Sequence, residues 1–309
     1  MRRIALCPRH AFTLIELLVV VAIIALLLAI LMPSLRRAKD QAQEVRCASN
    51  LRGFGAGFLS YAAENRAFYC SGSFDPDVSD GRDGPADRVG WVADLVNAQT
   101  AFPAVQRCPT NPAQFNQKLL PREFSPLGFY TKAEADDLIA RGFNTNYTQA
   151  WYMGRTQCIR ADGRVKDLRS TVGPLNDRWL NLVPPARVPL LGDGRTDTDE
   201  EADGKRYVKT MTDGPFGGAP YQVQTYADFG PAHGFGSYIL SNKKDHDRER
   251  ANLVFGDGHV GVFTDRDRDG EFGLNVQSEP YEQIDLSESV VFDGVLSLGR
   301  RSADPWRLE

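Results

Sequence analysis

A short acidic segment near the C-terminus carries a pattern that could bind a metal ion. Four of its carboxylates lie within seven residues, namely Asp265, Asp267, Asp269 and Glu271. Alternating carboxylates with Gly270 at the sixth position match the first half of an EF-hand loop, because Ca²⁺ prefers several oxygen ligands. The twelfth position, usually a bidentate glutamate, is Val276, so a further ligand would come from Glu271, Asn275 or Glu279. We expect a calcium site here, and the alternative is a solvated acidic loop.

The cysteines could form disulfide bonds or bind zinc. The chain has five of them, namely Cys7, Cys47, Cys70, Cys108 and Cys158. If a leader containing Cys7 is removed and the rest is exported, the remaining four allow three pairings. We expect Cys108 and Cys158 to form one bridge. Zinc is the less favoured alternative, because the sequence has no C-x-x-C or H-x-x-H spacing.

Histidine and serine side chains could serve acid–base or nucleophilic catalysis. The candidates are His233, His246, His259, Ser237 and Ser241. The chain has no G-x-S-x-G elbow, no H-E-x-x-H motif and no clear paired-carboxylate signature, and a turn hydrogen bond is the favoured role for His259. We therefore expect no enzyme. The second acidic run, 193–203, has poorer spacing for a metal and is expected to lie on the surface.

The elements that must position these groups divide the chain into two parts. From Phe12 to Met32, 19 of 21 residues are apolar, and a helix of that length spans about 31 Å, the thickness of a bilayer's hydrocarbon core. Residues 1–11 carry three arginines and no acidic residue, like the positive end of an export signal. A conventional signal peptide is disfavoured, because the apolar run is long and is followed by Pro33-Ser34 without an A-x-A cleavage site.

The composition excludes several classes of protein. The 309 residues are 42% hydrophobic and 25% charged, with a formal net charge of -4. This balance is too apolar for a disordered chain and too acidic for a typical nucleic-acid binder, so we expect no nucleic-acid partner. Only one segment is apolar enough to span a membrane, which excludes a polytopic membrane protein.

Glu16 is the exceptional residue of the apolar segment, because an unpaired carboxylate in lipid costs a few kcal/mol and needs a partner or a function. The run Phe12-Thr13-Leu14-Ile15-Glu16, after a short basic leader, resembles the N-terminal signature of type IV prepilins and type II secretion pseudopilins. Counted from Phe12, Glu16 is the fifth residue and Pro33 the twenty-second, as in that family.

The resemblance implies a processing and assembly pathway. A prepilin peptidase would cut between Ala11, where the family usually has glycine, and Phe12, and would methylate the new amino group of Phe12. Glu16 would then pair with the N-terminal amine of a neighbouring subunit, which would set the stagger of the helices. Removing three arginines takes the formal charge from -4 to -7. The resemblance also places the leader inside and the globular part outside.

Beyond Pro33 the pattern becomes that of an amphipathic helix. Apolar residues recur at helical spacing between Leu35 and Tyr61, with charged residues between them. We expect one helix to continue to about Asn65, with a kink at Pro33. The glycine-rich stretch 53–57 follows a helix rather than a strand, so it favours either a weakened helix or a close packing face over a phosphate-binding loop.

The rest of the chain is expected to form an α+β head. Short helices are predicted at 91–97 and, from the capping box Thr131-Lys132-Ala133-Glu134, at 131–141. Strands are predicted at 147–153, 188–192, 207–212, 236–240, 252–255, 259–263 and 289–298. The arms 252–255 and 259–263 form the best hairpin, around Gly256-Asp257-Gly258. We expect a mainly antiparallel sheet packed on the exposed half of the long helix.

Three segments of this head also resemble a narrower group. Cys47-Ala48-Ser49-Asn50-Leu51, Cys108-Pro109 and the run 251–260 are similar to the large pilin-like proteins of planctomycete and related bacteria, called the H-x9-DG family. In this chain ten residues rather than nine separate His246 from Asp257.

Together these predictions describe a leader at 1–11, a transmembrane helix at 12–33, an amphipathic continuation at 34–66 and an exported β-rich head at 67–309. We expect a single-pass protein of the cytoplasmic membrane, with its head in the periplasm or outside the cell. Its expected role is a pilin- or pseudopilin-like structural subunit, whose partners are prepilin peptidase, other subunits and the membrane. The alternative is a membrane-anchored binding protein that does not assemble.

Overall fold

The computed structural model describes residues 13–73, 84–124, 128–155, 174–181, 184–202, 204–212, 228–234, 249–264, 274–275 and 282–283. The chain divides into two compact units, Met1–Ala42 and Gln43–Glu309. The second unit includes the C-terminal part of the first helix, and it contains the site described below.

Helix α1 is continuous from Leu14 to Glu64 and is 51 residues long, with Pro33 inside it. This confirms the predicted single helix. It begins with a capping box, because Thr13 Oγ1 accepts a hydrogen bond from the Glu16 amide (3.2 Å) and Glu16 Oε2 accepts one from the Thr13 amide (2.9 Å). Arg66 and Ala67 have positive φ angles just beyond its C-terminus, where the helical backbone has ended.

The shorter elements follow in the second unit. The helices are α2 (Trp91–Asn97), η1 (Gln117–Leu119), α3 (Lys132–Ala140), α4 (Trp151–Arg155), α5 (Asp177–Leu180) and η3 (Pro185–Arg187). The strands are β1 (Phe115–Asn116), β2 (Tyr147–Gln149), β3 (Pro189–Asp193), β4 (Thr196–Ala202), β5 (Lys205–Val208), β6 (Arg250–Phe255), β7 (Val260–Thr264), β8 (Leu274–Asn275) and β9 (Glu282–Gln283). The predicted capping box of Thr131 and Glu134 is present at the start of α3.

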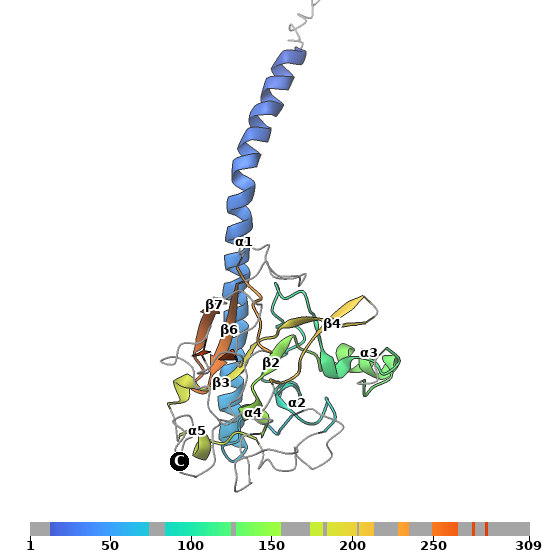
Figure 1. The fold of residues 1–309 in the computed structure, drawn as a ribbon, viewed down its shortest axis with the longest axis vertical. Helices are drawn as coiled ribbons and strands as arrows, with labels where there is room; N and C mark the ends of the chain where they lie inside the picture. The colour runs from blue at the N-terminus through green and yellow to red at the C-terminus, as the bar shows by residue number, and fades with distance from the viewer. Residues whose placement is uncertain are drawn as a thin grey trace, which may run out of the picture. The chain divides into compact units, whose positions relative to one another are not determined.

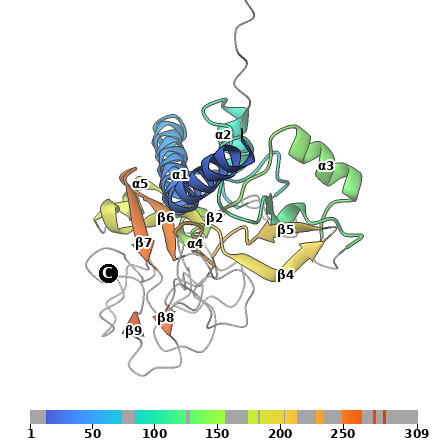
Figure 2. The same cartoon turned by 90° about the horizontal axis from the view of Figure 1, so that it is seen from above.

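The main sheet has four strands in the order β2-β3-β6-β7, and each neighbouring pair is antiparallel. The β6–β7 pair is the predicted hairpin, with a turn in which Gly258 has a φ of +84° that favours glycine. A second sheet has the order β1-β5-β4, and the β4–β5 pair lies to one side of the main sheet (Figure 2). The predicted α+β fold, with a long N-terminal helix on a mainly antiparallel sheet, is therefore confirmed (Figure 1).

The C-terminal half of α1 supplies much of the core of the second unit. Leu51, Phe54 and Phe58 are buried, and Phe54 makes edge-to-face ring contacts with Trp91 and Tyr147. Two of the helix glycines allow close approach. A Cβ on Gly55 would lie 2.8 Å from Val254 Cγ2, and a Cβ on Gly57 would lie 2.8 Å from Leu95 Cδ2. The predicted close packing face at 53–57 is confirmed.

Two predicted strands differ from the structure. The segment predicted as a strand at 147–153 is strand only to Gln149, and Trp151–Arg155 forms α4. The aromatic residues favour a strand locally, but tertiary contacts decide, since the Trp151 amide donates to Thr212 Oγ1 at 2.9 Å. The strand predicted at 207–212 is β5, which starts earlier and ends at Val208. The strands predicted at 236–240 and 289–298 lie outside the described residues.

Candidate metal centre

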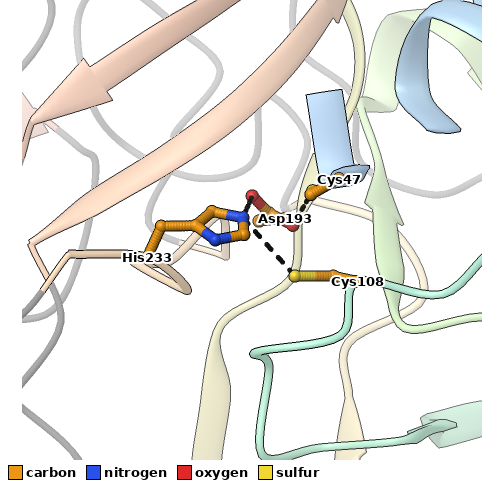
Figure 3. A group of neighbouring side chains, drawn as sticks. All are labelled: Cys47, Cys108, Asp193 and His233. Atoms are coloured by element: carbon orange, nitrogen blue, oxygen red, sulfur yellow. Dashed lines mark hydrogen bonds and ion pairs between the residues drawn. The ribbon is translucent and has the colours of Figure 1, made fainter. Parts of the chain in front are cut away.

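Four side chains that are far apart in the sequence meet inside the second unit. They are Cys47 from α1, Cys108 from the segment before β1, Asp193 at the end of β3 and His233 from the segment that pairs with β6. Figure 3 shows the two sulfur atoms, the carboxylate and the imidazole pointing toward one another. One ligand atom from each residue lies within 4.8 Å of those of the other three, and all four side chains are fully buried.

The individual distances are those of a tight cluster. His233 Nε2 lies 3.5 Å from Cys108 Sγ and 3.2 Å from Asp193 Oδ2. The second carboxylate oxygen, Asp193 Oδ1, lies 3.2 Å from Cys47 Sγ. The same imidazole nitrogen therefore faces both a sulfur and a carboxylate.

The other nitrogen of His233 has its own partner. His233 Nδ1 lies 2.8 Å from Thr110 Oγ1, and this hydroxyl can accept a hydrogen bond from an Nδ1–H. In the neutral tautomer with Nδ1–H donating to Thr110, Nε2 would carry a lone pair directed at the cluster. Metal-binding histidines are commonly held in this way through the nitrogen that does not bind the metal.

The remaining groups are held by neighbouring backbone and side-chain atoms. Asn146 accepts a hydrogen bond from the Cys108 amide at 2.8 Å and donates to the Cys108 carbonyl at 3.0 Å, which positions this loop. The Asn252 amide on β6 donates to Asp193 Oδ2 at 2.9 Å. Tyr147 Oη lies 3.5 Å from Cys47 Sγ. The cluster is therefore preorganised by contacts from the sheet and from the loop before β1.

The electrostatics of the cluster favour separated charges. Burial alone would lower the pKa of His233, but Asp193 and Cys108 raise it to about 10. Burial opposes ionisation of Cys108, but hydrogen bonds from Cys47 and His233 outweigh it and lower the pKa of this thiol. Burial, Cys108 and Asp193 raise the pKa of Cys47. Positive charge on His233 thus favours negative charge on the neighbouring Cys108.

The arrangement does not match a nucleophilic triad. In a triad the nucleophile and the carboxylate bind opposite nitrogens of the imidazole, whereas Cys108 and Asp193 both face Nε2 of His233 and Nδ1 faces Thr110. Cys108 and His233 are also fully buried, whereas a nucleophile and its base must meet the substrate. Four potential ligand atoms converging on one point are typical of a metal site.

The sequence pattern missed this cluster. Asp193 begins the acidic run that was predicted to lie on the surface, and this prediction is wrong for Asp193, which is fully buried. Local spacing also argued against zinc, whereas the four residues come from segments separated by 40 to 85 positions. The weak signals available were a cysteine on the core face of α1 and Asp193 at the end of an apolar strand.

Several predicted site residues cannot be placed. The calcium residues Asp265, Asp267, Asp269 and Glu271 lie outside the described residues, as do Ala11, Phe12, Cys158, His246, Ser237 and Ser241. The calcium site and the Cys108–Cys158 bridge therefore stay predictions. Within the described part of the chain, Cys47, Cys70 and Cys108 are buried and form no disulfide bond with one another.

His259 has the predicted role in a turn. Its Nδ1 lies 2.6 Å from Asp257 Oδ1, its amide donates to the same oxygen at 3.0 Å, and its ring stacks on Phe255. These contacts hold the β6–β7 turn.

Comparison with known proteins identifies the N-terminal segment alone. Residues 7–32 match the family model described as the prokaryotic N-terminal methylation motif. The match includes Phe12 and Glu16 and ends just before Pro33. No curated protein and no solved structure matches the chain significantly. The chain thus carries a prepilin-type cleavage and methylation motif, at the start of the one described helix that is long and apolar enough to cross a membrane.

Proposed function

We propose that the chain is a pilin- or pseudopilin-like structural subunit. It would be cut between Ala11 and Phe12 and methylated at Phe12 by prepilin peptidase, and assembled through α1 into a type II secretion pseudopilus or a type IV pilus-like filament. The observation that carries this proposal is the methylation motif at the start of a single helix, whose apolar half precedes a half built into a folded head.

The apolar half of α1 supports the proposal because the chain itself does not cover it. Its large apolar side chains between Leu14 and Met32 are exposed by 45% or more. Such a surface is stable only in lipid or against other apolar helices. Membrane storage before assembly and helix bundling after it would supply both environments.

Glu16 has one role within the chain and a second proposed role between chains. Its carboxylate caps α1 through Thr13, with Thr13 Oγ1 donating to Glu16 Oε2 at 2.7 Å. This uses one oxygen, so the charge can still meet the amino group of a neighbouring subunit's Phe12. In low dielectric that pairing would offset the desolvation of both groups.

Replacement by glutamine separates these two roles. Glutamine preserves the capping box but removes the charge, so Glu16→Gln tests the charge rather than the helix. We expect the variant to insert in the membrane and to be processed, and to form no filaments or cross-linked oligomers. Electron microscopy of surface filaments and cross-linking in whole cells would measure this.

The matched control is Glu134→Gln. Glu134 caps α3 with the same contacts, since its Oε2 accepts from the Thr131 amide at 2.7 Å and from Thr131 Oγ1 at 2.8 Å, but it lies in the head. This control should assemble normally. Wild-type assembly of Glu16→Gln would contradict the proposed pairing and favour the alternative, a membrane-anchored binding protein that does not assemble. An N-terminus other than methylated Phe12 in an intact-mass measurement would contradict prepilin processing.

A further inference from the structure

We propose that Cys47, Cys108, Asp193 and His233 bind one Zn²⁺ ion as a structural centre of the head. The proposal is independent of filament assembly, because all four residues belong to the second unit. It rests on the geometry of their ligand atoms, on their burial and on the contacts that hold them.

The distances fit a tetrahedral ion. Zinc binds sulfur at about 2.3 Å and nitrogen or oxygen at about 2.0–2.2 Å, so neighbouring ligand atoms of a tetrahedron lie about 3.3–3.8 Å apart. The observed distances are 3.5 Å from Cys108 Sγ to His233 Nε2, 3.2 Å from Asp193 Oδ2 to His233 Nε2 and 3.2 Å from Asp193 Oδ1 to Cys47 Sγ. One ligand atom from each residue lies within 4.8 Å of the other three, so shifts of about 1 Å or less would bring every pair to tetrahedral spacing.

The donor set selects zinc among common ions. Two thiolates, one imidazole and one carboxylate are soft and borderline ligands, which favour Zn²⁺ over Ca²⁺ or Mg²⁺. Four protein ligands with no access to solvent are typical of structural rather than catalytic zinc. Binding would leave Cys47 and Cys108 as thiolates and His233 as a neutral imidazole with Nδ1–H donating to Thr110, and the protons displaced from these groups would be released.

The charge of Asp193 supports a cation at this position. In the described part of the chain its one ion-pair partner is His233, and its two oxygens face a cysteine and a histidine rather than a lysine or arginine. Burying a carboxylate requires compensation. An ion pair between Asp193 and His233 alone would supply part of this compensation. Such a pair does not explain why the thiols of Cys47 and Cys108 are also present, whereas a zinc ion would use all four residues.

A bound ion would join four separate parts of the head. Cys47 belongs to α1, Asp193 to the end of β3, Cys108 to the segment before β1 and His233 to the segment that pairs with β6. The ion would therefore tie α1 to the sheet. Such a cross-link would resist local separation of these elements.

Metal analysis of the full-length chain in detergent tests the proposal. We expect about one zinc per chain in protein purified without added chelator. Cys108→Ser and Asp193→Asn should each lower the zinc content at least about tenfold, because each removes a ligand. Cys70→Ser and His259→Gln are matched controls, since Cys70 is another buried cysteine and His259 an exposed histidine, and neither belongs to the cluster. Both should keep the wild-type zinc content.

Two spectroscopic measurements on the unaltered chain test the proposal even if the variants do not fold. Protein produced with Co²⁺ should show the visible absorption of tetrahedral cobalt with thiolate ligands. X-ray absorption of the zinc form should show two sulfur and two nitrogen or oxygen neighbours at about 2.3 Å and about 2.0–2.2 Å.

Three results would overturn the proposal. The first is wild-type protein with no stoichiometric metal and four reactive thiols after removal of the leader. The second is a disulfide that joins Cys108 to Cys47 or to Cys158, seen as a mass lower by two hydrogens that reductant restores. The third is zinc content in Cys108→Ser and Asp193→Asn equal to that of the two controls.

Discussion

The two halves of helix α1 share one continuous backbone but opposite environments. Between Leu14 and Met32 the helix is almost entirely apolar, yet its large side chains are exposed. After Gln43 the sequence is more polar, yet Leu51, Phe54 and Phe58 are fully or almost fully buried. Hydrophobicity therefore does not decide burial within the chain. The periodic placement of apolar side chains and the presence of a matching sheet decide it, and the first half must find its partners elsewhere.

The largest expected difference between the halves comes from removing a large side chain. Phe54→Ala should lower the free energy of unfolding of the head by about 3–5 kcal/mol, because it leaves a cavity between Trp91 and Tyr147. Leu27→Ala, whose side chain is 54% exposed, should leave that free energy unchanged. Urea unfolding in detergent, followed by tryptophan fluorescence, measures both. Equal losses would show that the first half of α1 is also part of the folded head.

The second difference concerns Asp94, a buried residue whose carboxylate is hydrogen-bonded by Tyr61 from the second half of α1. Burial raises the pKa of Asp94 to about 6, although hydrogen bonds from Ser71 and Tyr61 oppose the shift. The folded state thus holds the proton more tightly than the unfolded state, so this contribution is complete below about pH 4 and is lost as the pH rises to about 6, a change of about 3 kcal/mol.

Asp94→Asn should remove this part of the pH dependence. Asparagine can still accept the Ser71 amide hydrogen bond, which is 2.7 Å long in the protein, but it does not titrate. Unfolding free energies between pH 4 and 7 should therefore fall less steeply in the variant. The same slope in both proteins would show that Asp94 is not the group that titrates.

The third difference lies within the second half and compares two glycines on the same helix. Gly55→Ala should destabilise the head by about 1–3 kcal/mol, because its Cβ would lie 2.8 Å from Val254 and 3.2 Å from the backbone of Gly258. Gly53→Ala should stabilise it by up to about 1 kcal/mol, because the nearest atom is 3.7 Å away and alanine favours a helix. Melting temperatures should move in opposite directions, and a shared direction would contradict the packing at Gly55.

The smallest difference concerns the two capping boxes. Thr131→Ala should lower the free energy of unfolding of the head by about 1 kcal/mol, because the first amide groups of α3 lose their acceptor. Thr13→Ala removes the corresponding acceptor from α1 but should leave the unfolding of the head unchanged. Thermal unfolding of both variants measures this. An equal loss of stability in Thr13→Ala would contradict the prediction, because it would show that the start of α1 contributes to the stability of the head.

Local sequence patterns predicted much of the fold. The capping box at Thr131, the period of apolar residues up to Tyr61 and the turn at Gly258 each act through neighbouring residues, so they could be recognised without the tertiary structure. The segment after Gln149 was predicted incorrectly because a distant residue, Thr212, binds the backbone of Trp151 and α4 replaces the strand.

By itself, the sequence determined the methylation motif, the apolar segment, the long helix and the β6–β7 hairpin, because each depends on residues close together in the chain. Only the tertiary structure decided the candidate metal centre. Cys47, Cys108, Asp193 and His233 have no common spacing, and only the position of Asp193 after an apolar strand distinguishes it in sequence from its acidic neighbours. The packing of α1 on the sheet brings the four ligand atoms within 4.8 Å of one another, and metal binding depends on that distance rather than on order along the chain.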